Sequence, residues 1–225
     1  QSGNQQHRSR GIRFLMLGVL VGMKQEARII RRFLPDAPIA LSNAAASGAV
    51  AGAERLLRAG ATRLLSFGCA GGLSTSVKPG TIIVADCVVM SDSSYEADAG
   101  LSRQFGADHA RQGRILHSHS LIETAEEKSR LYETTGCIAV DMESGAIART
   151  GKPFAVLRVV CDDSAHSLPP AARDGLKDGA IHLGGLLSSL VRQPSQIPAL
   201  IELGKDAAMA QKAMALFLEA HPPQL

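Results

Sequence analysis

The sequence predicts an α/β protein with helices on both faces of a central sheet. Largely apolar segments, such as residues 14–21 and 154–161, alternate with longer amphipathic segments, and this is the pattern of strands that are buried on both faces. Aromatic residues make up only 4% of the chain and tryptophan is absent, whereas small and aliphatic residues dominate. This composition favours helices packed closely on a sheet over an aromatic-rich β-sandwich.

The first half of the chain begins with strands and helices in regular alternation. The apolar strand 14–21 is followed by the amphipathic stretch 26–34, which predicts a helix. A short strand over 39–42 precedes a small-residue helix over 45–59 and a third strand over 63–67. We expect this third strand to leave the sheet through a glycine-rich loop, Gly-Cys-Ala-Gly-Gly-Leu.

A Pro79-Gly80 turn opens the next strand, which we expect over residues 81–90. Residues 91–120 are polar and rich in Ser, His and Gly, so we expect loops there with one short strand around 114–117. The later expected elements are a helix over 125–134, a strand over 137–142, a helix from Glu143, a strand over 154–161, a helical region from about Ala171, a linker over 193–198 and a helix over 199–220.

A single domain over residues 11–225 accounts for the chain, with residues 1–10 as a polar N-terminal arm. A chain of 225 residues can bury a core large enough to fold without disulfide or metal staples. Basic and acidic residues are interleaved and the net charge is only +3, so no basic stripe suits a phosphate backbone. We therefore expect no nucleic-acid partner.

The N-terminus and the cysteines indicate a cytoplasmic protein. The basic start followed by the apolar segment 14–23 resembles a secretory signal, but no small-residue cleavage site follows it. That segment is also far shorter than the roughly 20 residues of a membrane-spanning helix. Four cysteines lie in apolar or glycine-rich segments and form no CxxC motif, so we expect reduced, mostly buried thiols at Cys69, Cys87, Cys137 and Cys161.

Acidic residues stand at the predicted ends of different strands, where the reacting groups of α/β proteins gather. Taken singly, Glu26 could be a solvated helix residue, Glu143 a charge favoured by a helix dipole, and Asp162 a turn or N-cap residue. The glycine-rich segment 68–72 lets the backbone approach a ligand closely, but it lacks the spacing of a dinucleotide or P-loop motif. Together these residues predict acid–base chemistry on a polar, sugar-containing substrate, with no metal and no cofactor.

Several segments together resemble the family of nucleoside phosphorylases and methylthioadenosine/S-adenosylhomocysteine nucleosidases. They are GMKQEA, GCAGGL followed by VKPGTIIVAD, AVDMES and AVLRVVCDD, and the resemblance covers roughly residues 13–190. The segments AVDMESGAIA, LPP and RQPSQIPAL look most like the hopanoid-associated branch, which removes adenine from adenosylhopane. The resemblance implies a three-layer α/β/α sandwich around a twisted mixed sheet, a helical C-terminal tail and a homodimer.

The resemblance also implies roles for single residues. Asp162 corresponds to the family's acid at purine N7, with Asp163 as the alternative if the register is one residue off. Glu143 corresponds to the carboxylate that holds the ribose hydroxyls, Met142 to the apolar surface beneath the ribose, and Glu26 to the acid that orients the attacking water. The other expected substrate-binding residues are Cys69, Ala70, Gly71, Leu121 and Asp141.

Two residues depart from the family's pattern for binding the substrate. Leu121, between Ser120 and Ile122, stands where purine sites of the family place a phenylalanine over the base. Cys69 stands where many relatives carry a serine that contacts the nucleophile. We therefore expect weaker stacking on the base and a weaker hydroxyl contact.

The choice of nucleophile depends on charge. Phosphorylases of the family bind phosphate with arginines at the positions of Glu26 and Ser66, and a carboxylate there would repel phosphate but suits water. We expect hydrolysis, while Lys24 or Arg28 could still bind phosphate and leave phosphorolysis as an alternative. A small-thioether adenosine nucleosidase and a catalytically silent nucleoside-binding protein are further alternatives. The expected partner is a small-molecule or lipid-linked nucleoside, with transient contact at the inner membrane surface if it is lipid-linked.

Overall fold

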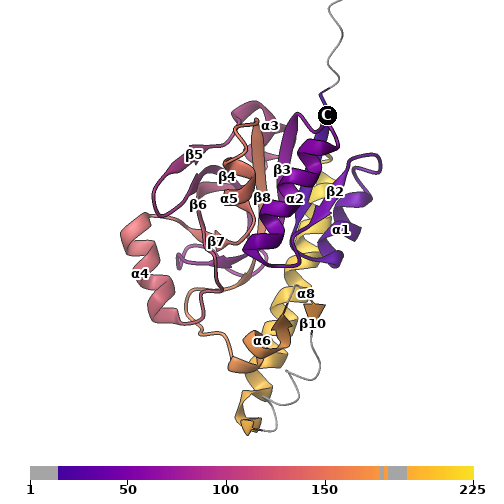
Figure 1. Cartoon of the computed structure of the whole chain (residues 1–225). Helices are drawn as coiled ribbons and strands as arrows, with labels where there is room; N and C mark the ends of the chain where they lie inside the picture. Colours follow the sequence, from indigo (N-terminus) through magenta and orange to yellow (C-terminus); the bar gives the residue numbers. More distant parts are fainter. Residues whose placement is uncertain (1–14, 178–179, 182–191) are drawn as a thin grey trace, which may run out of the picture.

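The computed structural model describes residues 15–177, 180–181 and 192–225 (Figure 1). The predicted arm over residues 1–10 and the predicted strand start at Phe14 lie outside these residues. Eight strands form the main sheet. They are β1 (Leu17–Val21), β2 (Ile39–Leu41), β3 (Arg63–Gly72), β4 (Ile82–Val89), β5 (Ser94–Glu96), β6 (Arg111–His117), β7 (Ala139–Asp141) and β8 (Phe154–Asp162).

The sheet is mixed and partly closed on itself. Strand β1 is parallel to β2 and β3, and β3 is parallel to β8, whereas β8 is antiparallel to β4. Strand β4 continues in parallel to β6, β6 in parallel to β7, and β7 returns antiparallel to the last two residues of β3, Gly71 and Gly72. The pairings β3–β8–β4–β6–β7–β3 therefore form a ring, with β2 and β1 extending from β3 on one side and β5 pairing with β4.

Helices cover both faces of the sheet and make three layers. One face carries α2 (Ala46–Arg58) and α5 (Ser144–Ala148), and the other carries α1 (Lys24–Arg31), α3 (Ala99–Gln104) and α8 (Ile197–Ala220). Each of the two helix layers packs on the sheet through its own buried cluster of apolar side chains. One cluster contains residues of α2 and α5, and the other contains residues of α1, α3 and α8. The predicted three-layer α/β/α sandwich with a C-terminal helix is confirmed.

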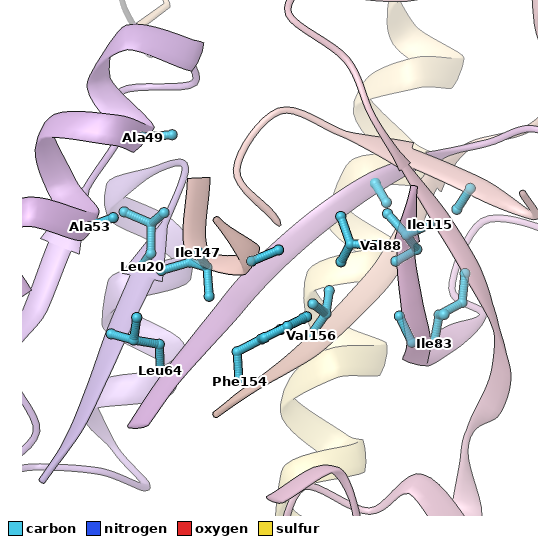
Figure 2. Close-up of a cluster of buried hydrophobic side chains, with 14 of the residues drawn as sticks. Leu20, Ala49, Ala53, Leu64, Ile83, Val88, Ile115, Ile147, Phe154 and Val156 are labelled. Carbon is cyan, nitrogen blue, oxygen red and sulfur yellow. The ribbon is translucent and has the colours of Figure 1, made fainter. Parts of the chain in front are cut away.

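Strand β1 shows how the sequence separates the two clusters. Successive side chains of a strand point to opposite faces, so Leu20 joins the α2 and α5 cluster while Val19 and Val21 join the opposite one. Figure 2 shows the first cluster, in which Ala49 and Ala53 of α2 face the sheet. Small side chains at these two positions let α2 lie close to the strands, as the composition predicts.

The other helices flank the layers. Helix α4 (Ala125–Thr135) begins at Thr124, whose hydroxyl accepts a hydrogen bond from the Glu127 N–H, and ends at Gly136 with a φ of 67°. A third apolar cluster, which includes Leu116, Ile122 and Val140, lies beside it with Leu131 of the helix packed against it. The C-terminal part adds α6 (Pro170–Gly175) and the antiparallel pair β9 (Leu176–Lys177) and β10 (Ala180–Ile181). Short 3₁₀ helices lie at Ala107–His109 and Pro194–Gln196.

The predicted loop at residues 68–72 is wrong, because β3 continues as a strand to Gly72. Its glycines do not form a turn; they allow a side chain from another segment to approach the strand closely. A Cβ atom at Gly68 would lie 2.5 Å from the Oε1 atom of Glu26. The missing side chain therefore makes room for a carboxylate beside a strand.

Two other regions differ from the predicted secondary structure. Residues 91–120 hold β5, α3 and a β6 that starts at Arg111, and the side chain of Asp98 caps α3 by accepting a hydrogen bond from the Leu101 N–H at 2.7 Å. The region from Ala171 onward is not helical throughout, since β9 and β10 interrupt it. The expectation for residues 182–191 lies outside the described residues.

Membrane-spanning helices and cysteines were both considered from the sequence. Among the residues that the structure describes, no helix has the length and apolar character needed to cross a membrane. All four cysteines are free, with Cys87 and Cys137 buried and Cys69 and Cys161 half-buried, as the sequence predicts.

Candidate active site

A cavity of about 690 Å³, counting its open mouth, lies where β1, β3, β7 and β8 end. All the site residues predicted from the sequence line it, namely Glu26, Cys69, Ala70, Gly71, Leu121, Asp141, Met142, Glu143 and Asp162. The remaining lining residues were not predicted as site residues: Gly22, Met23, Ala44, Ser120, Ile122, Val140 and Cys161. The topology thus brings residues from six separate segments to one place.

Glu26 is buried at the start of α1 and is held by backbone N–H groups. Its Oε2 accepts hydrogen bonds from the N–H groups of Gly22 and Met23, and its Oε1 accepts one from Cys69, each at 2.8 Å. A glutamate at the third position of a helix commonly reaches back to the N-cap in this way. The interpretation of Glu26 as a solvated helix residue is therefore wrong.

Cys69 takes part in the site through its backbone. Its N–H donates to Glu26, and its carbonyl accepts a hydrogen bond from Nη1 of Arg158 at 3.3 Å. Neither contact needs a side-chain hydroxyl, so the exchange of serine for cysteine leaves both in place. A hydrogen bond with Cys69 and burial raise the pKa of the neighbouring Cys161 thiol, which keeps Cys161 protonated and disfavours a thiolate nucleophile there.

Glu143 and Asp141 lie on either side of Met142 and are both buried. The Oε1 atom of Glu143 accepts a hydrogen bond from the Ser42 hydroxyl at 2.9 Å. Asp141 accepts hydrogen bonds from the backbone N–H and the hydroxyl of Ser144. Asp141 therefore caps the start of α5, whereas Glu143 does not cap it with its side chain.

Arg158 is the residue that the sequence analysis missed. Its side chain is completely buried in the middle of β8. Its Nη2 donates to the Ser66 hydroxyl at 2.6 Å and lies 2.8 Å from Oδ2 of Asp141 and 3.4 Å from Oε2 of Glu143. A charged residue inside an otherwise apolar strand needs a buried partner of opposite charge, and that signal was present in AVLRVVC.

The pKa values of the buried carboxyl groups diverge. Burial alone would raise the pKa of Asp141, but Arg158, His117 and Ser144 together lower it to about 2. Burial raises the pKa of Glu143 to about 7; Arg158 opposes the rise, and the charges of Asp141 and Glu26 add to it. Burial also raises the pKa of Glu26, against the effects of Arg158 and the three backbone N–H groups. Such divergent pKa values are typical of acid–base sites.

The side chains of Asp162 and Asp163 lie in different places. Asp162 lines the cavity, and its Oδ2 lies 2.6 Å from Nζ of the buried Lys128. The Oδ1 of Asp163 accepts hydrogen bonds from the N–H groups of Ala165 and His166 and so stabilises the following turn. The register that places Asp162 in the site agrees with this geometry.

The cavity lining includes the aliphatic side chains of Leu121, Ile122 and Val140, and none of its lining residues in the described part of the chain carries an aromatic ring. Leu121 is exposed by 37%, so its side chain borders solvent. No metal-binding group of His, Cys, Asp and Glu occurs among the described residues.

The model of the phosphorylase superfamily matches residues 42–192, which is more than half of the chain. The chain belongs to the phosphorylase superfamily. The expectation of an enzyme of this family is therefore confirmed. The matched residues include Cys69, Glu143 and Asp162, whereas Glu26 precedes them.

Solved structures share the fold of this phosphorylase-superfamily enzyme. A Francisella philomiragia protein provisionally assigned as a 5′-methylthioadenosine/S-adenosylhomocysteine nucleosidase is 17% identical with a TM-score of 0.68, covering 94% of this chain and 100% of its own. The Neisseria meningitidis nucleosidase of that name, in complex with methylthio-immucillin-A, is 18% identical with a TM-score of 0.64 over 92% and 99%. Futalosine hydrolase of Helicobacter pylori is 18% identical with a TM-score of 0.61 over 92% and 98%.

Proposed function

We propose that this enzyme hydrolyses the N-glycosidic bond of a purine nucleoside and releases adenine. The observation that carries the proposal is the buried, backbone-anchored carboxylate of Glu26, which lines the same cavity as Glu143 and Asp162. The fold is shared with proteins whose names include nucleosidases and a hydrolase, which supports the same reaction class.

Three carboxyl groups and one cation set the charge at the inner end of the cavity. Glu26, Asp141 and Glu143 share Arg158, whose guanidinium is already bound to Asp141 and Ser66. A phosphate anion entering this region would be repelled by these carboxyl groups in their ionised form, and the guanidinium beside them is already engaged. Water meets no such repulsion, so the charge favours hydrolysis.

The two cations considered for phosphate lie elsewhere. Lys24 and Arg28 are exposed on α1, and neither lines the cavity. Phosphorolysis would need a cation close to the nucleophile to bind the phosphate oxygens. The position of these two side chains therefore supports water as the nucleophile.

The proposed reaction assigns one task to each carboxyl group. Asp162 donates a proton to purine N7 while the C1′–N9 bond breaks and its electron pair moves onto the purine. The oxygen of a water molecule bonds to C1′ and gives its proton to Glu26, whose raised pKa suits a base. Glu143 accepts hydrogen bonds from the ribose hydroxyls, and these strengthen as the sugar becomes oxocarbenium-like.

Cleavage in phosphate-free buffer tests the proposal. We expect adenine and the free sugar, with oxygen-18 from solvent water at the anomeric carbon when the product is analysed before exchange. Glu26→Gln should lower the rate by about 10²–10⁴-fold without abolishing substrate binding, because a positioned base contributes about that much. Glu54→Gln, at an exposed position of α2, is the matched control and should react like the wild type.

Strict dependence on added phosphate, with a sugar 1-phosphate as the product, would overturn hydrolysis in favour of phosphorolysis. Binding without any cleavage in either buffer would identify a silent nucleoside-binding protein. The cluster of buried carboxyl groups argues against that alternative, since burying charge is costly and a binding module would not need it.

We also propose that the 5′ group of the substrate is a hopane skeleton, as the sequence resemblance implies. The aliphatic side chains of Leu121 and Ile122 in the cavity lining support an apolar 5′ group. On the same resemblance we propose a cytoplasmic homodimer that contacts the inner membrane surface transiently. Sedimentation velocity tests the dimer, and co-sedimentation with anionic lipid vesicles tests the membrane contact.

A further inference from the structure

Lys128 is a buried charge whose position in its own helix is unfavourable. It lies in the N-terminal half of α4, where the helix dipole disfavours a cation. Its side chain is almost completely removed from solvent, and a buried ammonium group is costly unless it is paired and hydrogen-bonded. Helix stability does not account for a lysine at this position.

The ammonium group of Lys128 has an acceptor for each of its three N–H bonds. It donates to Oδ2 of Asp162 at 2.6 Å, to the carbonyl of Asp163 at 2.7 Å and to the carbonyl of His166 at 3.0 Å. Lysine has only three such donors, so its capacity is filled. The group therefore has a single defined position directly behind the carboxyl group of Asp162.

The other oxygen of Asp162 is left facing the cavity. Its Oδ1 lies 3.2 Å from the point where a Cβ atom at Gly71 would stand, and Gly71 lines the cavity. Within the described part of the chain, this oxygen accepts a weak hydrogen bond from the Cys161 thiol, at 3.5 Å. Lys128 itself does not line the cavity, so it reaches the site only through Asp162.

The start of α4 is fixed to the segment that follows Asp162. The Ala125 N–H donates to the Ser167 hydroxyl at 3.0 Å, and the Leu168 N–H donates to the Glu123 carbonyl at 2.7 Å. These contacts fix the position of Lys128 relative to Asp162. The two charges therefore do not depend on flexible side chains alone to stay together.

We propose that Lys128 is the positioning residue of the acid, a role that rests on the proposed cleavage of a purine nucleoside. It holds Oδ2 so that Oδ1 is presented to purine N7, and its charge stabilises the carboxylate that Asp162 becomes. Asp162 takes up a proton from solvent as the nucleoside binds; this proton passes from Oδ1 to N7 as the C1′–N9 bond breaks, and Lys128 keeps all three of its protons.

The effect of a Lys128 variant on the release of two different leaving groups distinguishes a positioning role from a structural one. Adenine leaves easily only when N7 is protonated, whereas p-nitrophenolate leaves as a stable anion without a proton. We expect Lys128→Met to lower kcat for adenine release by about 10²-fold. Release of p-nitrophenolate from a β-riboside with the same 5′ group should stay within about threefold of the wild type, because it needs no acid. Lys152→Met, at an exposed position, is the matched control.

A double-mutant cycle with Asp162→Asn provides the second readout. If Lys128 acts through Asp162, Lys128→Met should lower adenine release by less than about threefold in the Asp162→Asn background, because residues that share one interaction are not additive. If Lys128→Met fails to fold, Lys128→Arg carries the test, since it keeps the charge with altered geometry. We then expect about tenfold slower adenine release and unchanged p-nitrophenolate release.

Equal losses with both leaving groups, additive losses in the cycle or full activity of Lys128→Met would each overturn the role of Lys128 while leaving the proposed function intact. A wild-type enzyme that releases no adenine from any adenosine derivative would overturn the proposed function, and the role of Lys128 with it.

Discussion

Asp141 and Glu143 show how geometry at the scale of single residues separates two similar carboxyl groups. Both lie near Arg158, but Nη2 is 2.8 Å from Asp141 and 3.4 Å from Glu143. Asp141 also accepts hydrogen bonds from Ser144, and its pKa is lowered to about 2, whereas that of Glu143 is raised to about 7. One arginine thus keeps one acid ionised and leaves its neighbour able to titrate near neutrality.

The pKa of Glu143 predicts a pH dependence. Below a pH of about 7 Glu143 is protonated and loses acceptor capacity for the ribose hydroxyls, so kcat/KM should rise with pH and level off above about 7. Glu143→Gln should remove this rise and impair ribosyl substrates more than 2′-deoxy analogues. Steady-state kinetics over pH 5 to 9, roughly the range where this group titrates, measure both effects. An unchanged rise in the variant would assign it to another group, such as Glu26.

At the scale of elements, an irregularity in the β3–β8 pairing positions Asp162, the proposed acid. Ala70 pairs with Val160 and Gly71 pairs with Asp162, so Cys161 is left out of the register. Neighbouring residues of a regular strand point to opposite faces, and a bulge changes that. Both Cys161 and Asp162 therefore line the cavity, which a regular strand would not allow.

Gly71→Ala tests this arrangement. The added Cβ atom would lie 3.2 Å from Oδ1 of Asp162 and 3.4 Å from Cγ1 of Val140, so the carboxyl group must move by a few tenths of an ångström. We expect kcat for adenine release to fall by about tenfold, because small displacements of a catalytic group are costly. Circular dichroism should show a retained fold.

Gly204→Ala is the matched control for that variant, because nothing lies within 4 Å of its added Cβ atom in α8. It should leave activity unchanged and raise the free energy of unfolding by about 0.5–1 kcal/mol, since alanine is the better helix former. Equal activity of the two alanine variants would contradict the role given to the bulge.

The whole molecule assembles one cavity from distant parts of the chain. The ring of strands from β3 through β8, β4, β6 and β7 turns the ends of β3, β7 and β8 toward one another. The helix layers on either side (Figure 1) bury the two large apolar clusters, one of which is drawn in Figure 2, and hold this ring in shape. Leu121 lines the cavity and is 37% exposed, so the cavity borders solvent at this residue.

This shape predicts the preferred substrate. Adenosine with a long apolar 5′ substituent should react with a much higher kcat/KM than methylthioadenosine, because burial of the remote apolar group supplies binding energy that aligns the ribose. Parallel kinetics with a series of 5′-alkylthioadenosines of increasing length measure the trend. A preference for the methylthio compound would instead indicate a small-thioether nucleosidase.

Local patterns in the sequence were sufficient for most of the strands and helices and for the position of the acids at strand ends. Strand and helix periodicities depend on neighbouring residues, so β1, α2, α4 and β8 were predicted within a few residues of their ends. Glu26 and Asp162 were found because parallel strands end at a common edge, whereas Glu143 follows β7, which is antiparallel to β3 and reaches the site through the ring of strands. The missed helix α3 also had a local signal in Asp98, which caps it.

Burial and pairing could not be read from the sequence in the same way, because they depend on contacts between distant segments. Lys128 stands among charged residues in AEEKSRL and looks like an exposed helix residue, yet it contacts Asp162, 34 positions away. The partners of Arg158 come from β3 and from the segment around β7. The β3–β8 bulge follows from the pairing of two strands about 90 residues apart. Charges become buried, and their pKa values diverge, only when tertiary packing removes water from them.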